Sequence, residues 1–89
     1  MKIKKLNWKT FNDVEYRADV SIKNLLGMRF ICKKVCYADY YYYKYIINGK
    51  HFGDYLGYKC NSFEDGKDLC EKIYNEFCNE ILNNLFETN

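Results

Sequence analysis

The first two-thirds of the chain alternates between apolar and polar positions, a pattern typical of strands with one buried face. Alternation or high strand propensity covers residues 6–10, 16–20, 28–32 and 40–47, and a further strand is expected over 51–58. Asn48-Gly49 is the favoured pair for a two-residue type I′ hairpin turn, and Asn12-Asp13 also suits a turn. Gly53 and Gly57 indicate a bulge or an early end in the last strand.

After Ser62 the apolar positions recur every three or four residues, which predicts a helix over 63–86, about 36 Å long. Ser62 is a suitable N-cap residue, and Glu64 and Asp65 are acids in the first turn. The apolar stripe contains Leu69, Cys70, Ile73, Tyr74, Phe77, Ile81, Leu82 and Leu85. Its middle residues, Ile73 and Phe77, are expected to be the most completely buried, against Trp8 and the strand 40–47.

These elements predict one α+β domain of 89 residues, with the sheet in 1–60 and the helix in 62–86. The fold class is an antiparallel four- to five-stranded sheet with one long C-terminal helix packed on one face. Whether two copies form a homodimer through the strand 40–47 is left open.

Charge is divided at the same boundary. Residues 1–62 carry twelve Lys/Arg and five Asp/Glu, whereas residues 63–89 carry two and seven, which gives about +7 followed by about −5. Such a separation steers binding partners more than it stabilises a fold. A binding module is therefore the class of protein that the charge pattern favours.

Other classes of protein have less support. No apolar run is long enough to span a membrane, and the N-terminus lacks the apolar region of a signal peptide, so a cytoplasmic protein is expected. Cys32 and Cys36 are four apart, and the single histidine, His51, is interpreted as an exposed turn residue. The five cysteines are expected to be free, largely buried thiols, with no metal, cofactor or catalytic site.

The tyrosines give a more specific signal, because eight of the ten lie between positions 37 and 58. Neighbours in a strand point to opposite faces, so Tyr41, Tyr43, Tyr45 and Ile47 should face the helix. Tyr40, Tyr42, Lys44 and Ile46 should then lie on the other face of the sheet. Exposed tyrosines beside basic residues are typical of protein or nucleic-acid contact surfaces, so Tyr40, Tyr42, Lys44 and Arg29 are candidate binding residues. A solvated face that is rich in tyrosine through codon bias is the alternative.

The polar face of the helix is the second candidate surface. Only Lys67 and Lys72 balance six acids between positions 64 and 80. Glu64, Asp68 and Glu71 are therefore candidates for binding a basic partner, although most charged helix faces are simply solvated. Glu71 is expected on the solvent-exposed side.

One family resemblance follows from short motifs along most of the chain. They are Trp8, Tyr16-x-Ala18, Leu26-Gly27-x-x-Phe30-Ile31, Leu56-Gly57 and Ser62-x-Glu64-Asp65-Gly66-Lys67-x-x-Cys70-Glu71. The set resembles small phage and prophage accessory proteins. It departs from them at Gly66 and Cys70, where alanine is usual, and in the longer segment from Cys32 to Tyr40. The resemblance implies a non-enzymatic phage or mobile-element protein that binds and inhibits a host defence complex, as anti-CRISPR proteins do. Sequestration of that complex's nucleotide signal is a related possibility.

A second resemblance competes with the first. Residues 45–50, then Leu56-Gly57 and 62–65, are similar to the strand-strand-helix of AP2-like DNA-binding domains of integrases. In that family a three-stranded sheet lies in the major groove of DNA with the helix behind it. The resemblance implies a DNA-binding module that uses the basic face of the sheet, although only Arg17 and Arg29 are available to contact bases specifically.

Overall fold

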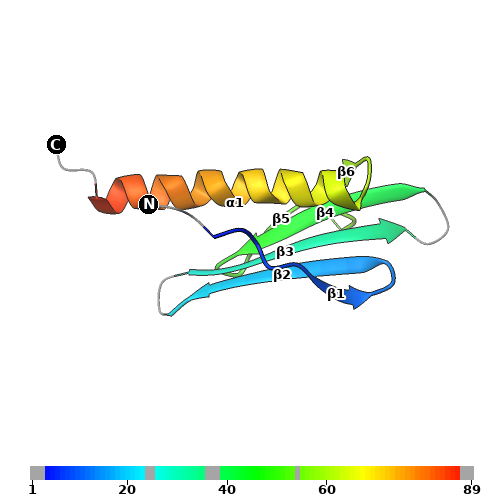
Figure 1. Cartoon of the computed structure of the whole chain (residues 1–89), viewed down its shortest axis with the longest axis horizontal. Helices are drawn as coiled ribbons and strands as arrows, with labels where there is room; N and C mark the ends of the chain where they lie inside the picture. The colour runs from blue at the N-terminus through cyan, green and yellow to red at the C-terminus, as the bar shows by residue number, and fades with distance from the viewer. Residues whose placement is uncertain (1–3, 24–25, 36–38, 54, 87–89) are drawn as a thin grey trace.

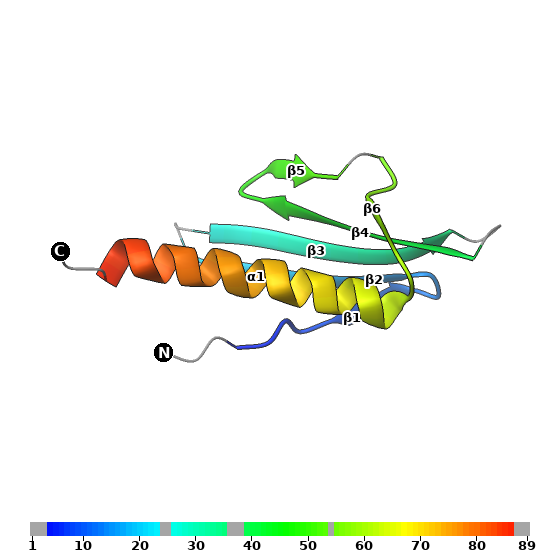
Figure 2. The same cartoon turned by 90° about the horizontal axis from the view of Figure 1, so that it is seen from above.

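The computed structural model describes residues 4–23, 26–35, 39–53 and 55–86. These described residues form six strands and one helix: β1 (Lys9–Asn12), β2 (Glu15–Ile22), β3 (Leu26–Val35), β4 (Tyr40–Ile47), β5 (Lys50–Phe52), β6 (Tyr58–Cys60) and α1 (Phe63–Phe86). The sheet is antiparallel, with the order β1-β2-β3-β4-β5, and β6 pairs with β4. Figures 1 and 2 show α1 lying across one face of the sheet. The predicted α+β fold class is confirmed.

The region after the Asn48-Gly49 turn differs from the predicted strand over 51–58. Asn48 and Gly49 have φ angles of 47° and 85°, as a type I′ turn requires. The chain then forms two short strands, β5 and β6, and both pair with β4. Gly53 and Gly57 have φ angles of 103° and 104°, a backbone conformation that ends β5 and turns the chain back to β4. Both edges of β4 are consequently occupied, so two copies could not dimerise by pairing this strand without displacing β5 and β6.

The N-terminal segment also differs from the expected strand over 6–10, because β1 begins only at Lys9. Before Lys9 the chain runs beside α1 (Figure 2). Leu6 is buried, and its backbone N–H donates a hydrogen bond of 2.9 Å to Oε1 of Glu71. The expectation that Glu71 lies on the solvent-exposed side of the helix is therefore wrong, since the N-terminal segment covers it.

The core lies between α1 and the centre of the sheet. Phe30 is fully buried, stacks on Tyr45 and contacts the ring of Tyr74 edge-on. Cys70 and Tyr74 are the most buried side chains described on α1, at 0% and 8% exposure, whereas Ile73 and Phe77 are only half-buried. The expected centre of burial was therefore wrong. The helix presents the line of positions 66, 70 and 74 to the sheet, while Ile73 and Phe77 line a groove beside β4 and β5.

The start of α1 is fixed by its cap and by a close approach to the sheet. Asp65 N–H donates a 3.0 Å hydrogen bond to the hydroxyl of Ser62, and Asn61 N–H donates one of 2.9 Å to the carboxylate of Asp65. The predicted N-cap is confirmed. A Cβ on Gly66 would lie 3.0 Å from Cys60 Sγ and 3.2 Å from Cys32 Sγ, so the absence of a side chain there lets the helix start close to the strands. No described helix is long and apolar enough to cross a membrane.

Candidate binding face of the sheet

The face of the sheet opposite α1 is here termed the open face. Ala18, Phe30 and Cys32 point to the helix, and their neighbours along the strands point away. Most of these outward residues are exposed or half-buried, but Ile31, at the centre of this face, is buried, with 6% exposure. The strand register aligns the outward residues in three rows across the sheet. The rows are Glu15–Lys33–Tyr42–Lys59, Arg17–Ile31–Lys44 and Asp19–Arg29–Ile46–His51.

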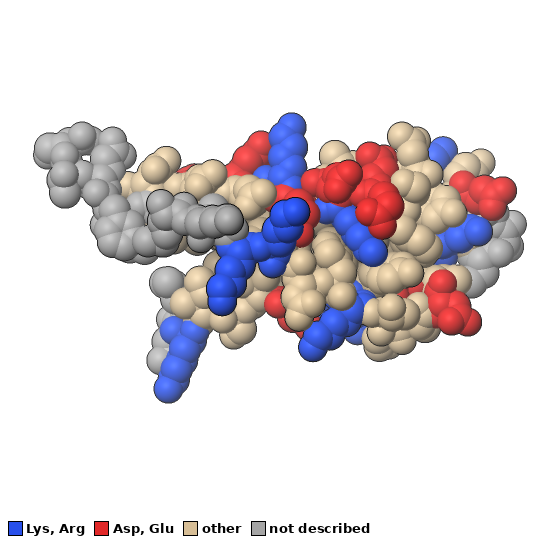
Figure 3. All heavy atoms as spheres, viewed as in Figure 1, with Lys and Arg blue, Asp and Glu red and all other residues tan. Residues whose placement is uncertain are grey.

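The open face is cationic, and the helix layer behind it is acidic. In the three rows, Arg17, Arg29, Lys33, Lys44 and Lys59 outnumber the acids Glu15 and Asp19. Lys9 pairs with Arg17 from β1 and adds a further cation. On α1, the acids Glu64, Asp68, Glu76 and Glu80 are exposed. Both signs are interspersed on the side of the molecule seen in Figure 3.

Exposed aromatic rings on this side of the sheet are paired with cations. The Arg17 guanidinium lies 3.6 Å from the ring centre of Phe11, and Lys59 Nζ lies 4.3 Å from that of Tyr40. Lys33 Nζ lies 5.6 Å from the ring centre of Tyr55, which is 88% exposed. Each distance is within the range of a cation–π interaction. Flat rings beside positive charges are the two components of surfaces that bind nucleic-acid strands.

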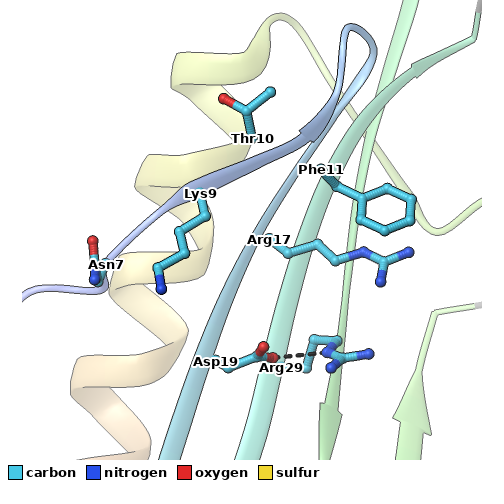
Figure 4. Close-up of a pocket in the computed structure, with 7 residues that line it drawn as sticks. All are labelled: Asn7, Lys9, Thr10, Phe11, Arg17, Asp19 and Arg29. Atoms are coloured by element: carbon cyan, nitrogen blue, oxygen red, sulfur yellow. Dashed lines mark hydrogen bonds and ion pairs between the residues drawn. The ribbon is translucent and has the colours of Figure 1, made fainter.

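A pocket of about 280 Å³ lies at the corner of the open face where β1, β2 and β3 meet. It is lined by Asn7, Lys9, Thr10, Phe11, Arg17, Asp19 and Arg29 (Figure 4). Figure 4 shows Phe11, Arg17 and Arg29 gathered on the same side of the strands.

Carboxylates on β2 orient both arginines of the pocket. Arg17 donates through Nε to Glu15, and Arg29 donates through Nε to Asp19 over 2.7 Å. The hydrogen bond and negative charge of Asp19 raise the pKa of Arg29 above its ordinary value, so its guanidinium stays protonated. The pocket therefore holds permanent positive charge in a defined orientation.

The structure brings some of the candidate residues together and separates others. Arg29, Tyr42 and Lys44 lie in adjacent rows of the open face, and Tyr40 is the first residue of β4. Tyr42 and Lys44 are half-buried rather than fully exposed, and Lys44 Nζ lies 3.5 Å from the backbone oxygen of Tyr55. The other candidates, Glu64, Asp68 and Glu71, belong to α1, where the first two are exposed and Glu71 is held by Leu6.

Several residues of this face were not among the predicted binding residues. Arg17, Lys33 and Lys59 follow from strand alternation once the register is known, but the register depends on which strands pair. Phe11 lies at an irregularity of β1 between Thr10 and Asn12, where alternation no longer predicts the direction of a side chain. The position of the Tyr55 ring depends on the β5–β6 connection.

The buried thiols have no evident chemical role. Cys32, Cys60 and Cys70 are free and buried between α1 and the sheet, which confirms the expected burial for these three, whereas Cys36 lies outside the described residues. Burial raises the pKa of the Cys60 thiol to about 11, and a hydrogen bond with Cys32, together with burial, raises the pKa of Cys70. Neutral buried thiols are poor nucleophiles. Within the described ranges, no three His, Cys, Asp or Glu side chains are grouped as metal ligands would be.

No family model, curated protein or solved structure matches this chain. The proposed function therefore rests on the site itself.

Proposed function

We propose that this protein is a nucleic-acid-binding module that uses the open face of its sheet. The observation that carries the proposal is the distribution of charge: the three rows of the open face hold five cations and two acids, and the helix with its acids covers the opposite face. This arrangement of a basic sheet with a helix behind it is also what the resemblance to AP2-like domains implies.

The location of the acids decides whether a polyanion can approach. Acids on the binding side would repel phosphates and cancel the attraction of the cations. Here Glu15 and Asp19 are the acids of the three rows, and each is occupied by an arginine side chain. The remaining positive charge comes from Lys59, which is exposed, and from Lys33 and Lys44, which are half-buried.

Fluorescence anisotropy with a labelled DNA 20-mer at 50, 100 and 200 mM salt tests this proposal. Each neutralised phosphate contributes about −0.7 to −0.9 to the slope of log K against log salt. Contacts to three or four phosphates therefore predict a slope of about −2 to −4. The double variant Lys33→Glu/Lys44→Glu should lose most of the affinity.

Lys72→Glu is the matched control, because Lys72 is an exposed lysine on α1, behind the sheet. It should leave the affinity within about twofold of the parent at 100 mM salt, where charges farther apart than about 10 Å are screened. Absence of binding at 50 mM salt would exclude the proposed function. Equal losses from Lys72→Glu and from the double variant would show that attraction is not localised to the open face.

A second proposal concerns the outer face of α1, and it follows the resemblance to phage anti-defence proteins. Asp68, Glu76 and Glu80 are exposed, and within the described part of the chain no ion pair holds them. A basic groove of a host defence complex is the partner that this face would fit.

The test is DNA cleavage by purified CRISPR–Cas effector complexes with and without this protein. If the helix makes the contact, Glu64→Lys/Asp68→Lys should abolish inhibition while Lys33→Glu/Lys44→Glu should not. The reverse pattern would assign inhibition to the open face, and no inhibition of any complex tested would count against this second function.

A further inference from the structure

In the pocket at the corner of β1, β2 and β3, two arginine side chains are held in fixed positions, which attraction to a positively charged surface alone would not require. Arg17 and Arg29 are diagonal neighbours on adjacent strands, because Arg17 pairs with Ile31, two residues from Arg29. Diagonal neighbours of this kind have Cβ atoms about 7–8 Å apart. Both guanidinium groups are fixed at Nε by a carboxylate, which leaves their terminal nitrogens without a hydrogen-bond partner among the described residues. Two such groups can donate to one phosphate from two sides.

Phe11 forms the aromatic side of the same pocket. Its ring is 57% exposed although it stacks on the Arg17 guanidinium, so one part of the ring is covered and the rest faces solvent. An exposed phenyl ring next to two arginines can stack with a base whose neighbouring phosphate lies between the arginines. Figure 4 shows the ring and the two guanidinium groups on the same side of the strands.

We propose that this pocket binds one nucleotide of an unpaired nucleic-acid strand, with the phosphate at Arg17 and Arg29 and the base on Phe11. The proposal rests on the proposed function and specifies the kind of nucleic acid. In a duplex the faces of the bases are covered by their neighbours, so only the backbone could reach the pocket and Phe11 would contribute little. In a single strand each base has an accessible face.

Two other aromatic rings on the same side of the sheet also lie beside cations. Tyr55 beside Lys33 and Tyr40 beside Lys59 repeat the combination of Phe11 with Arg17. Base–aromatic stacking does not depend on base identity, so binding should tolerate changes of sequence.

The experiment compares a labelled dT12 single strand with a 12-base-pair duplex at the same salt concentration. The parent should bind the single strand more tightly. Phe11→Ala should weaken single-strand binding by about 5- to 100-fold, the range for loss of one stacked base, and change duplex binding by less than about twofold. Phe11→Tyr retains the ring and should retain the affinity. Arg29→Met should weaken single-strand binding and make its salt slope shallower by about 0.7.

Ile22→Ala is the matched control, because Ile22 is 48% exposed at the other end of β2. Its affinity should equal that of the parent. An NMR measurement on the parent protein avoids any effect of a substitution on folding. The ring carbon–proton resonances of Phe11 should shift upfield when dT12 is added, and should shift much less when inorganic phosphate is added.

The outcomes separate the inference from the proposed function. Tighter duplex binding, with Phe11→Ala affecting neither ligand, would overturn the inference and leave the proposed function standing. Absence of binding to either ligand at 50 mM salt would overturn both. Binding of free thymidine monophosphate as tight as that of dT12 would also overturn the inference, since the pocket would then recognise a nucleotide and not a strand.

Discussion

The open face of the sheet and the outer face of α1 carry opposite charge, but their side chains are held differently. On the open face, Arg17 and Arg29 are fixed by Glu15 and Asp19. On α1, acids such as Glu76 and Glu80 are exposed, and no ion pair among the described residues restrains them. Restrained side chains lose less conformational entropy on binding. A ligand is therefore bound at lower entropic cost by the open face, whereas the helix acids act mainly through their long-range field.

The largest effect on stability should come from alanine substitutions at two neighbouring residues of β3 whose side chains point to opposite faces of the sheet. Phe30→Ala removes a fully buried ring and should lower the free energy of unfolding by about 3–5 kcal/mol, most of the stability of a small domain. Arg29→Ala removes an exposed ion pair and should cost about 1 kcal/mol or less. Urea denaturation followed by circular dichroism measures both. Similar losses from the two variants would contradict the assignment of the faces.

A smaller effect should distinguish two acids of α1. Glu71→Ala removes the acceptor of the Leu6 N–H and should cost about 1–2 kcal/mol, because a partly buried donor loses its partner. Glu76→Ala, on the exposed side of the same helix, should change stability by about 0.5 kcal/mol or less. The comparison is made by thermal and urea denaturation at pH 7. If both substitutions are neutral, the N-terminal segment does not depend on Glu71.

The stability of the folded protein should fall at alkaline pH, because the Cys60 thiol is buried between α1 and the sheet. The Cys60 thiol has a pKa of about 11 in the folded protein, above its ordinary value of 9.0. Its contribution is fully present below pH 9 and is lost as the pH rises through 11, because the unfolded chain releases the proton first. Burial also raises the pKa of Tyr43 and Tyr74, which adds to the decline.

Melting temperatures between pH 8 and 11 test this expectation, with Cys60→Ala as the comparison. The variant should be less stable at pH 8 but should lose less stability as the pH rises. Parallel curves for the parent and the variant would show that Cys60 is not the group responsible.

The smallest effect concerns Lys67, a cation that the helix directs inward. Its Nζ lies 3.9 Å from the ring centre of Tyr16 and 6.0 Å from that of Trp8. Lys67→Met should cost at least about 0.5–1 kcal/mol, the range for exposed cation–π interactions, because the Lys67 side chain is only 19% exposed, whereas Lys72→Met should be neutral. A double-mutant cycle with Tyr16→Leu isolates the interaction. A coupling energy near zero would contradict a stabilising interaction between Lys67 and the ring of Tyr16.

The elements that the sequence predicted well are those whose pattern depends only on local spacing. The helix bounds, the Ser62 cap and the Asn48-Gly49 turn follow from short-range preferences, and the structure confirms all three. The side of the sheet taken by Tyr43 and Tyr45 was also predicted, since β4 is long and regular.

The features that the sequence did not predict depend on how distant segments meet. The hydrogen bond from Leu6 to Glu71 joins residues 65 positions apart, and nothing in either local pattern indicates it. Burial of Cys70 and Tyr74, in place of Ile73 and Phe77, depends on the angle at which the helix crosses the sheet. The corner pocket needs the β1 irregularity and the β2–β3 register together, which is why Phe11 was not selected.

The position of α1 after all six strands has a consequence for synthesis of the chain. The ribosome produces Phe30 and Cys32 well before Cys70 and Tyr74, the helix residues that bury the same face of the sheet. During that interval the nascent sheet exposes its apolar face, and the partner of Leu6 does not yet exist. Completion of the fold is therefore delayed until after α1 has been translated, and a chain interrupted before Gly66 would display an uncovered apolar sheet to chaperones and proteases.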